Sequence, residues 1–160
     1  MDKLTSLDYA ELLKFAVYKF HRAILNKTQL NKILFYAYGI YLAETGKPLF
    51  DDDQPKAWPY GPVFPKVNRL VKPDIVPEGF SPDIVSLFQS DPVAMQAIKD
   101  AANKLYNKSA FKLTQWSHKE GSPWHQTIYP DDAQCRPWDT IIDNGLIQAY
   151  FSIENNRDVR

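Results

Sequence analysis

One short stretch of the chain brings together histidine, serine and glutamate, the residue types that could perform acid–base or nucleophilic chemistry. Residues 113–124 contain Ser117, His118 and Glu120. His118 could act as a base oriented by Glu120, with Ser117 as nucleophile, which would give a hydrolase-type site. Side chains one or two positions apart on a helix do not face each other, so Ser117 and His118 cannot pair on a regular helix. We therefore expect His118 and Glu120 to be structural, holding a helix end by hydrogen bonds, and we assign no catalytic residue.

The sequence lacks metal-binding and phosphate-binding patterns. The three histidines and Cys135 show no ligand spacing typical of zinc sites. The acidic run 51–53 lacks the glycine and distal glutamate of a calcium loop, so we expect a solvated polar turn there. The six glycines are dispersed and form no phosphate-binding loop. We therefore predict no metal and no cofactor.

Composition favours one globular domain with no nucleic-acid partner. The chain has 160 residues, of which 44% are hydrophobic and 24% charged, as in average soluble domains. Nineteen basic residues balance nineteen acidic ones, so the net charge is zero. Nucleic-acid domains usually carry a basic excess, and its lack makes nucleic acid an unlikely main partner. We expect a single domain over residues 1–160 with a core over about 8–151.

The number of cysteines and the length of the apolar segments indicate the cellular compartment of the protein. One cysteine, Cys135, rules out an internal disulfide framework and fits a reducing compartment. The first residues show no basic segment followed by an apolar one, so we expect no signal peptide. The longest uncharged apolar run, 33–43, is too short to span a bilayer. These features predict a cytoplasmic protein without membrane contact.

Hydrophobic periodicity predicts two long helices at the start of the chain. The first is expected to begin near Asp8 and to run past His21, burying a stripe formed by Leu13, Ala16, Val17, Phe20 and Ile24. The second is expected to be capped by Thr28 and to stop at Gly46. It is apolar nearly all round, which places it in the middle of the domain.

The remaining sequence predicts shorter helices and a small β element. Residues 50–63 lose the helical period, and a short extended or β segment is expected there. Serine or aspartate followed by proline, or by an apolar pattern, marks helix starts at Ser81, Ser90-Asp91, Ser109, Ser122 and Asp143. The fold class is therefore mainly α, a single compact domain of about seven helices. The pattern ends at Phe151, and we expect residues 152–160 to be dispensable.

Three stretches resemble the Panacea antitoxin domain family, which is also called SocA-like and is often phage-associated. Residues 30–50 match its K-L-L-Y-F-A…L-x-x-x-G-x-P-L-F helix. Residues 57–63, Ala-Trp-Pro-Tyr-Gly-Pro-Val, match its A-W-x-Y-G-P-V turn. Residues 113–124 match its L-x-x-x-[ST]-H-x-E-x-P-W segment, with Gly121-Ser122 inserted before Pro123. The resemblance covers about residues 10–151.

The resemblance implies a bacterial or prophage antitoxin that neutralises a cognate toxin by direct binding. One family member delivers its toxin to a cytosolic protease, so a protease is a second implied partner. Three alternatives stay open: a proteolytic adaptor, a hydrolase-type enzyme using His118 and Glu120, and a DNA-binding repressor. We expect Gly61 to be structural. The candidate toxin-facing residues are Trp58, Tyr60, Pro62, Trp116 and Trp124.

Overall fold

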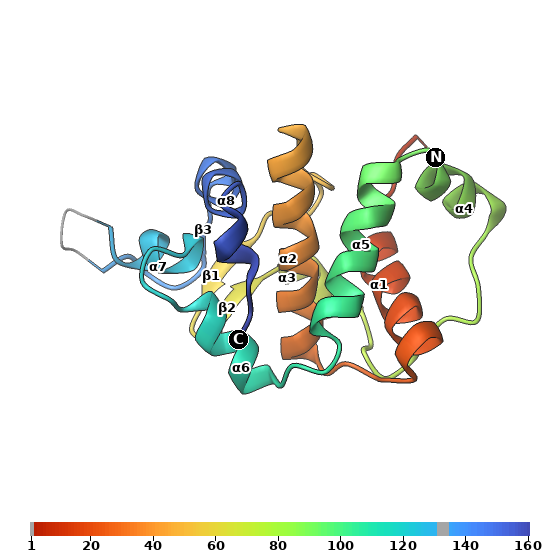
Figure 1. The fold of residues 1–160 in the computed structure, drawn as a ribbon, viewed down its shortest axis with the longest axis horizontal. Coiled ribbons are helices and arrows are strands. Elements are labelled where there is room, and N and C mark those ends of the chain that lie inside the picture. Colours follow the sequence, from red (N-terminus) through yellow and green to blue (C-terminus); the bar gives the residue numbers. More distant parts are fainter. Residues whose placement is uncertain (1, 131–134) are drawn as a thin grey trace.

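The computed structural model describes residues 2–130 and 135–160, and it is organised around one buried helix. That helix, α2 (Lys27–Thr45), stands in the middle of the molecule (Figure 1). Helices α1 (Ser6–His21) and α5 (Pro92–Leu105) lie on one side of α2, and α6, α7 and α8 lie with a small sheet on the other (Figure 1). The prediction of a mainly helical fold is confirmed, with eight α-helices among the described residues.

The N-cap of the central helix lies two residues before Thr28, which was the expected cap. Asn26 is the N-cap, because its side chain accepts a hydrogen bond from the Gln29 amide while the Gln29 side chain accepts one from the Asn26 amide. The helix ends, as expected, at Gly46, whose φ of 73° is the left-handed conformation that glycine adopts without strain. Twelve of its nineteen residues are buried, which confirms its central position.

The prediction of a buried apolar stripe on α1 is wrong for its last residues. Leu13 and Val17 are buried, but Phe20 is 61% exposed and Ile24 is 55% exposed. The helix does not run past His21, because Arg22 takes the left-handed conformation and carries Ile24 off the helix face. The buried face lies instead towards the beginning of α1, around Tyr9, and leaves its last turn uncovered on one side.

The three helices that follow α2 in the chain each begin with a proline at the first helical position. These are α3 (Pro65–Leu70), α4 (Pro82–Gln89) and α5. The inward positions predicted for α5, namely Ala94, Ile98, Ala101 and Leu105, are all buried. In contrast, no residue of α4 is buried, so this helix covers the core only thinly.

A three-stranded antiparallel sheet confirms the β segment expected near residues 50–63 and adds a strand to it. The strands are β1 (Lys56–Trp58), β2 (Gly61–Val63) and β3 (Thr140–Ile141), in the order β2-β1-β3. Trp58 pairs with Gly61 and Lys56 with Ile141. The two-residue strand β3 was not anticipated, because so short a strand carries no alternating pattern.

Side-chain caps start the C-terminal helices at the expected residues. Ser109 caps α6 (Ala110–Ser117), Ser122 caps α7 (Pro123–Ile128), and Asp143 caps α8 (Asn144–Phe151). A 3₁₀ helix, η1 (Glu154–Arg157), follows α8. None of the helices among the described residues has both the length and the apolar character that crossing a bilayer requires.

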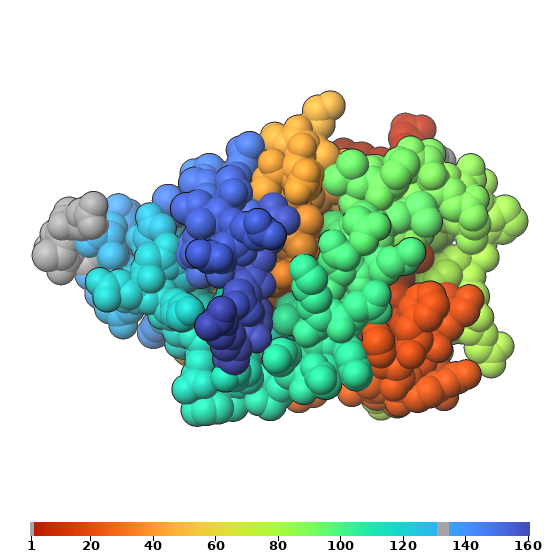
Figure 2. Space-filling model, viewed as in Figure 1, coloured from red at the N-terminus to blue at the C-terminus, as the bar shows by residue number. Residues whose placement is uncertain are grey.

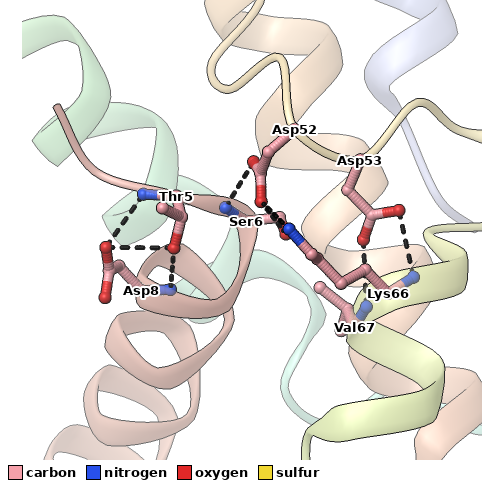
Figure 3. A network of polar contacts seen from close by, with 7 residues as sticks. All are labelled: Thr5, Ser6, Asp8, Asp52, Asp53, Lys66 and Val67. Atoms are coloured by element: carbon pink, nitrogen blue, oxygen red, sulfur yellow. Dashed lines mark hydrogen bonds and ion pairs between the residues drawn. The ribbon is translucent and has the colours of Figure 1, made fainter.

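The acidic run 51–53 is not the solvated turn that the sequence suggested. The Asp53 carboxylate accepts hydrogen bonds from the Lys66 and Val67 amides at the start of α3, and that of Asp52 accepts from the Ser6 amide and hydroxyl (Figure 3). Burial alone would raise the pKa of Asp52, but the hydrogen bonds from Ser6 and Lys66 outweigh it and lower that pKa. The run thus joins the beginnings of α1 and α3.

Both ends of the chain extend the core beyond the expected range 8–151. Leu4 and Val159 are each buried. The Tyr36 hydroxyl donates to the Arg157 carbonyl at 2.8 Å, and the Trp116 indole donates to the Asn156 carbonyl at 3.2 Å. The last residues therefore supply acceptors that two large core side chains need.

Removing residues 154–160 should lower the free energy of unfolding by about 3 kcal/mol, because Tyr36 and Trp116 lose acceptors and Val159 is no longer buried. Urea titration followed by fluorescence measures this change. Arg160→Ala is the matched control, since Arg160 is largely exposed. A truncated chain with the stability of the intact one would contradict the packing role of this segment.

Candidate functional site

The three sequence stretches that carry the family resemblance meet at one end of the small sheet. The turn between β1 and β2 consists of Pro59 and Tyr60, and Tyr60 is 72% exposed. Trp58 is half-buried, and its indole donates to a carboxylate oxygen of Asp139 at 2.9 Å. Its carbonyl accepts a hydrogen bond from the Trp124 indole at 2.7 Å. The turn is thus fixed to α7 on one side and to the segment before β3 on the other.

Gly61 lets this turn approach the core closely. Its φ of 119° is unfavourable for residues with side chains. A Cβ atom at this position would stand 2.6 Å from the Ser117 hydroxyl oxygen and 2.9 Å from Lys32 Cε. Ser117 and Lys32 therefore occupy the space that a side chain at position 61 would need, and the turn lies directly on α2 and α6.

Lys32 lies beneath the turn and is almost fully buried. Its exposed fraction is 1%, and among the described residues no carboxylate forms an ion pair with its ammonium group. Burial lowers the pKa of Lys32 to about 8. A buried cation without a carboxylate partner opposes folding, so the core accepts a cost at this position.

His118 packs against Trp124 and does not form the predicted hydrogen bonds with its neighbours. The two rings stack with their centroids 3.7 Å apart, and His118 Nε2 is buried without a hydrogen-bond partner. Burial, with smaller contributions from Lys32 and His125, lowers the pKa of His118. Glu120 is exposed and has no hydrogen bond within the described residues. The helix end is instead held by Ser122, whose hydroxyl donates to the Ser117 carbonyl at 2.8 Å.

These side chains are not arranged as an open catalytic site. The Ser117 hydroxyl is buried and donates to the Thr114 carbonyl at 3.0 Å. The buried nitrogen of His118 faces no hydroxyl, because Nε2 has no partner. Among the described residues no group of three or more His, Cys, Asp or Glu side chains comes together as metal ligands.

Of the five candidate toxin-facing residues, Tyr60 is exposed, Trp58 is half-buried and the other three are buried. Trp116 and Trp124 are 6% and 4% exposed, and Pro62 is also buried. Their apolar area is used in the core, whereas Tyr60 and part of Trp58 face solvent. Sequence patterns had pointed to aromatic residues in proline-rich turns without separating the buried from the exposed ones.

Two exposed aromatic residues near Trp124 had not been selected from the sequence. Trp138 is 48% exposed and stacks on Trp124 with a centroid distance of 6.0 Å. Tyr129 is 50% exposed and lies edge-on to Trp124 at 6.3 Å. We call Trp58, Tyr60, Tyr129 and Trp138 the aromatic rim. Three of its residues contact the buried Trp124, and the strands and α7 that carry most of it lie at one end of the molecule (Figure 1).

Gly61→Ala should destabilise the fold by about 2–4 kcal/mol, since it adds both backbone strain and a clash with Ser117. Two controls separate these contributions. Gly121 has a φ of 88° but open space around it, so Gly121→Ala should cost only about 1 kcal/mol. Gly79 has neither constraint, so Gly79→Ala should cost less still. Equal stabilities of the three variants in chemical denaturation would show that the turn is not seated tightly on the core.

Lys32→Met should stabilise the protein at pH 7 by about 3 kcal/mol, because the unfavourable burial of a charge disappears. A lysine pKa lowered from 10.5 to about 8 means that the unfolded chain binds more protons between these values. The free energy of unfolding of the wild type should therefore rise, relative to that of Lys32→Met, between about pH 8 and pH 10.5. The difference between the two proteins should disappear at the upper end of this range. Urea titrations across this range test it. A variant less stable than wild type at pH 7 would show that the fold holds the ammonium group favourably.

Comparison with known proteins gives a family and one relative. The profile of the family described as "Antitoxin SocA-like, Panacea domain" matches residues 30–125, which include α2 from Leu30 onward, the turn between β1 and β2, and His118. A protein named Antitoxin SocA from Caulobacter vibrioides (strain NA1000 / CB15N) is 29% identical over 110 residues. The match covers 62% of this chain and 58% of that protein. No solved structure gives a significant match.

The matched residues span more than half of the chain and contain the turn, the buried lysine and the histidine that meet in the structure. The protein therefore belongs to the SocA-like Panacea domain family of antitoxins.

Proposed function

We propose that this chain is a cytoplasmic antitoxin that neutralises a cognate protein toxin by binding it directly. Membership of an antitoxin family supports the proposal, as does a relative named Antitoxin SocA. The single cysteine, Cys135, is exposed and unpaired, which fits a reducing compartment. The observation that carries the binding mode is the aromatic rim on a tightly supported turn.

The aromatic rim has the properties of a protein-binding surface. Tyrosine and tryptophan supply large contact areas while losing few rotatable bonds, and both are enriched among residues that dominate binding energy. Trp58 is held by Asp139, and the Trp58 carbonyl is held by Trp124, so little freedom is lost on binding. Tyr60 has the largest exposed fraction of the four side chains, so it offers the most area to a partner relative to its size.

The alternatives make different demands on the molecule. A hydrolase would need His118 and Glu120 to act on a common substrate, but one nitrogen of His118 is buried and Glu120 is exposed without a partner. A DNA-binding repressor would need a basic surface, and the chain has no net positive charge. A proteolytic adaptor would bind the toxin in the same way and would need a further contact surface for the protease.

Tyr60→Ala should weaken binding of the toxin encoded by the adjacent reading frame by about 30-fold, since it removes an exposed aromatic contact. Its melting temperature should stay near that of the wild type. Trp58→Ala should weaken binding as well, with some loss of stability because its hydrogen bond to Asp139 is lost. Titration calorimetry and thermal unfolding on the same samples measure both quantities.

Phe111→Ala is the matched control, because Phe111 is 71% exposed and lies on α6, outside the aromatic rim. The Phe111→Ala variant should bind toxin as tightly as the wild type. Co-expression of the variant or of the wild type should restore growth in cells that produce the toxin. If Tyr60→Ala and Trp58→Ala both melt early yet bind toxin normally at low temperature, the turn serves the fold alone and the toxin binds elsewhere.

A further inference from the structure

An apolar groove lies at the other end of the molecule, between α1, α4 and α5. In Figure 2 these segments, orange-red, yellow-green and green, meet on the side away from the sheet and α7. The groove has a volume of about 440 Å³. Its apolar lining includes Phe15, Phe20, Phe80, Phe88, Met95 and Ile98. No residue of α4 is buried, so this wall of the groove is held only by partly covered side chains.

The apolar surface around the groove continues along the outer face of α1. Phe20 is 61% exposed, and Ile24, just beyond the helix, is 55% exposed. A second hollow, which contains Ile24, shares Phe15 and Lys19 with the groove. The apolar stripe that the sequence pattern placed in the core thus faces solvent over its last positions.

The charged lining of the groove has one sign only. Lys19 and Lys99 are the charged residues among those that line it. Within the part of the chain that the structure describes, neither lysine is in an ion pair. The Lys19 ammonium instead lies 5.5 Å from the centre of the Phe15 ring and 6.0 Å from that of Phe20. Two cations that line an apolar groove, one of them beside the exposed Phe20, would attract an acidic segment with apolar side chains.

Charge argues against a second copy of this chain as the occupant. A symmetric pair of grooves would bring Lys19 and Lys99 of each copy close to the same lysines of the other. Like charges in an interface oppose association. A hollowed surface between three helices is also better suited to receive side-chain knobs of a fourth helix than to lie on a bilayer.

We propose that the groove between α1, α4 and α5 is a docking site for an acidic amphipathic helix of a partner protein. Apolar side chains of that helix, three or four residues apart, pack against Phe20 and the groove floor. Its acidic residues face Lys19 and Lys99. The site is separate from the aromatic rim and does not depend on toxin binding, so the chain can hold two protein partners at opposite ends.

The test uses a fluorescent peptide of about 18 residues, with Leu and Phe at helical spacing and Glu elsewhere, and a matched peptide with Lys in place of Glu. Anisotropy should give a dissociation constant on the order of 10–100 µM for the acidic peptide. The double variant Lys19→Glu/Lys99→Glu should weaken binding at least about tenfold, and Phe20→Ala about fivefold. Binding should also weaken as salt is raised.

Two controls match these changes in charge and exposure. Lys112→Glu/Lys119→Glu alters the net charge equally, and Phe111→Ala removes an equally exposed ring, both away from the groove. Neither should affect peptide binding, and thermal unfolding should show all variants folded. Each of the following would overturn the proposal: equal binding of the basic peptide, peptide binding unchanged by the groove variants, no binding at 1 mM peptide, or Phe20-dependent capture by anionic vesicles.

Discussion

Burial of α2 on nearly all sides is the constraint on which the rest of the structure depends. A helix that is apolar around its whole circumference must be covered by other elements, and α1, α5, α6 and α8 all pack on it. The fit is close at Gly39, where a Cβ atom would stand 2.3 Å from the Phe151 ring of α8. The hydroxyls of Tyr36 and Tyr38 reach Arg157 and Asn144, so the C-terminal residues are tied to the same helix.

The polar residues of α2 position the site. The Asn31 side chain accepts a hydrogen bond from the Phe64 amide at 2.9 Å, directly after β2, and donates one to Asn68 of α3. Lys32 follows Asn31 in the sequence, and its side chain packs against Gly61. A residue that opposes folding beside a tightly seated turn is typical of positions kept for function rather than for stability. The aromatic rim is therefore a surface carried by the core and not a loop added to it.

Sequence reasoning succeeded where local chemistry decides the outcome. Ser109, Ser122 and Asp143 cap helices because their side chains accept backbone amides within three residues, which needs no knowledge of the fold. It failed where tertiary packing decides. Phe20 fits the apolar period of α1 but is 61% exposed at the groove beside α5, and Trp116 and Trp124 are aromatic residues that are buried in the core. The burial of Lys32 has no local signal, because it depends on packing against residues that are distant in the sequence, such as Gly61.

Hydrogen exchange of the free protein and of its complex with the toxin tests the central claim most directly. Amides inside α2 are already protected by burial and should not change. If the aromatic rim binds the toxin, exchange should slow in residues 56–63 and 135–141 on complex formation. Slowed exchange confined to other elements, with residues 56–63 unchanged in a stable complex, would contradict the account.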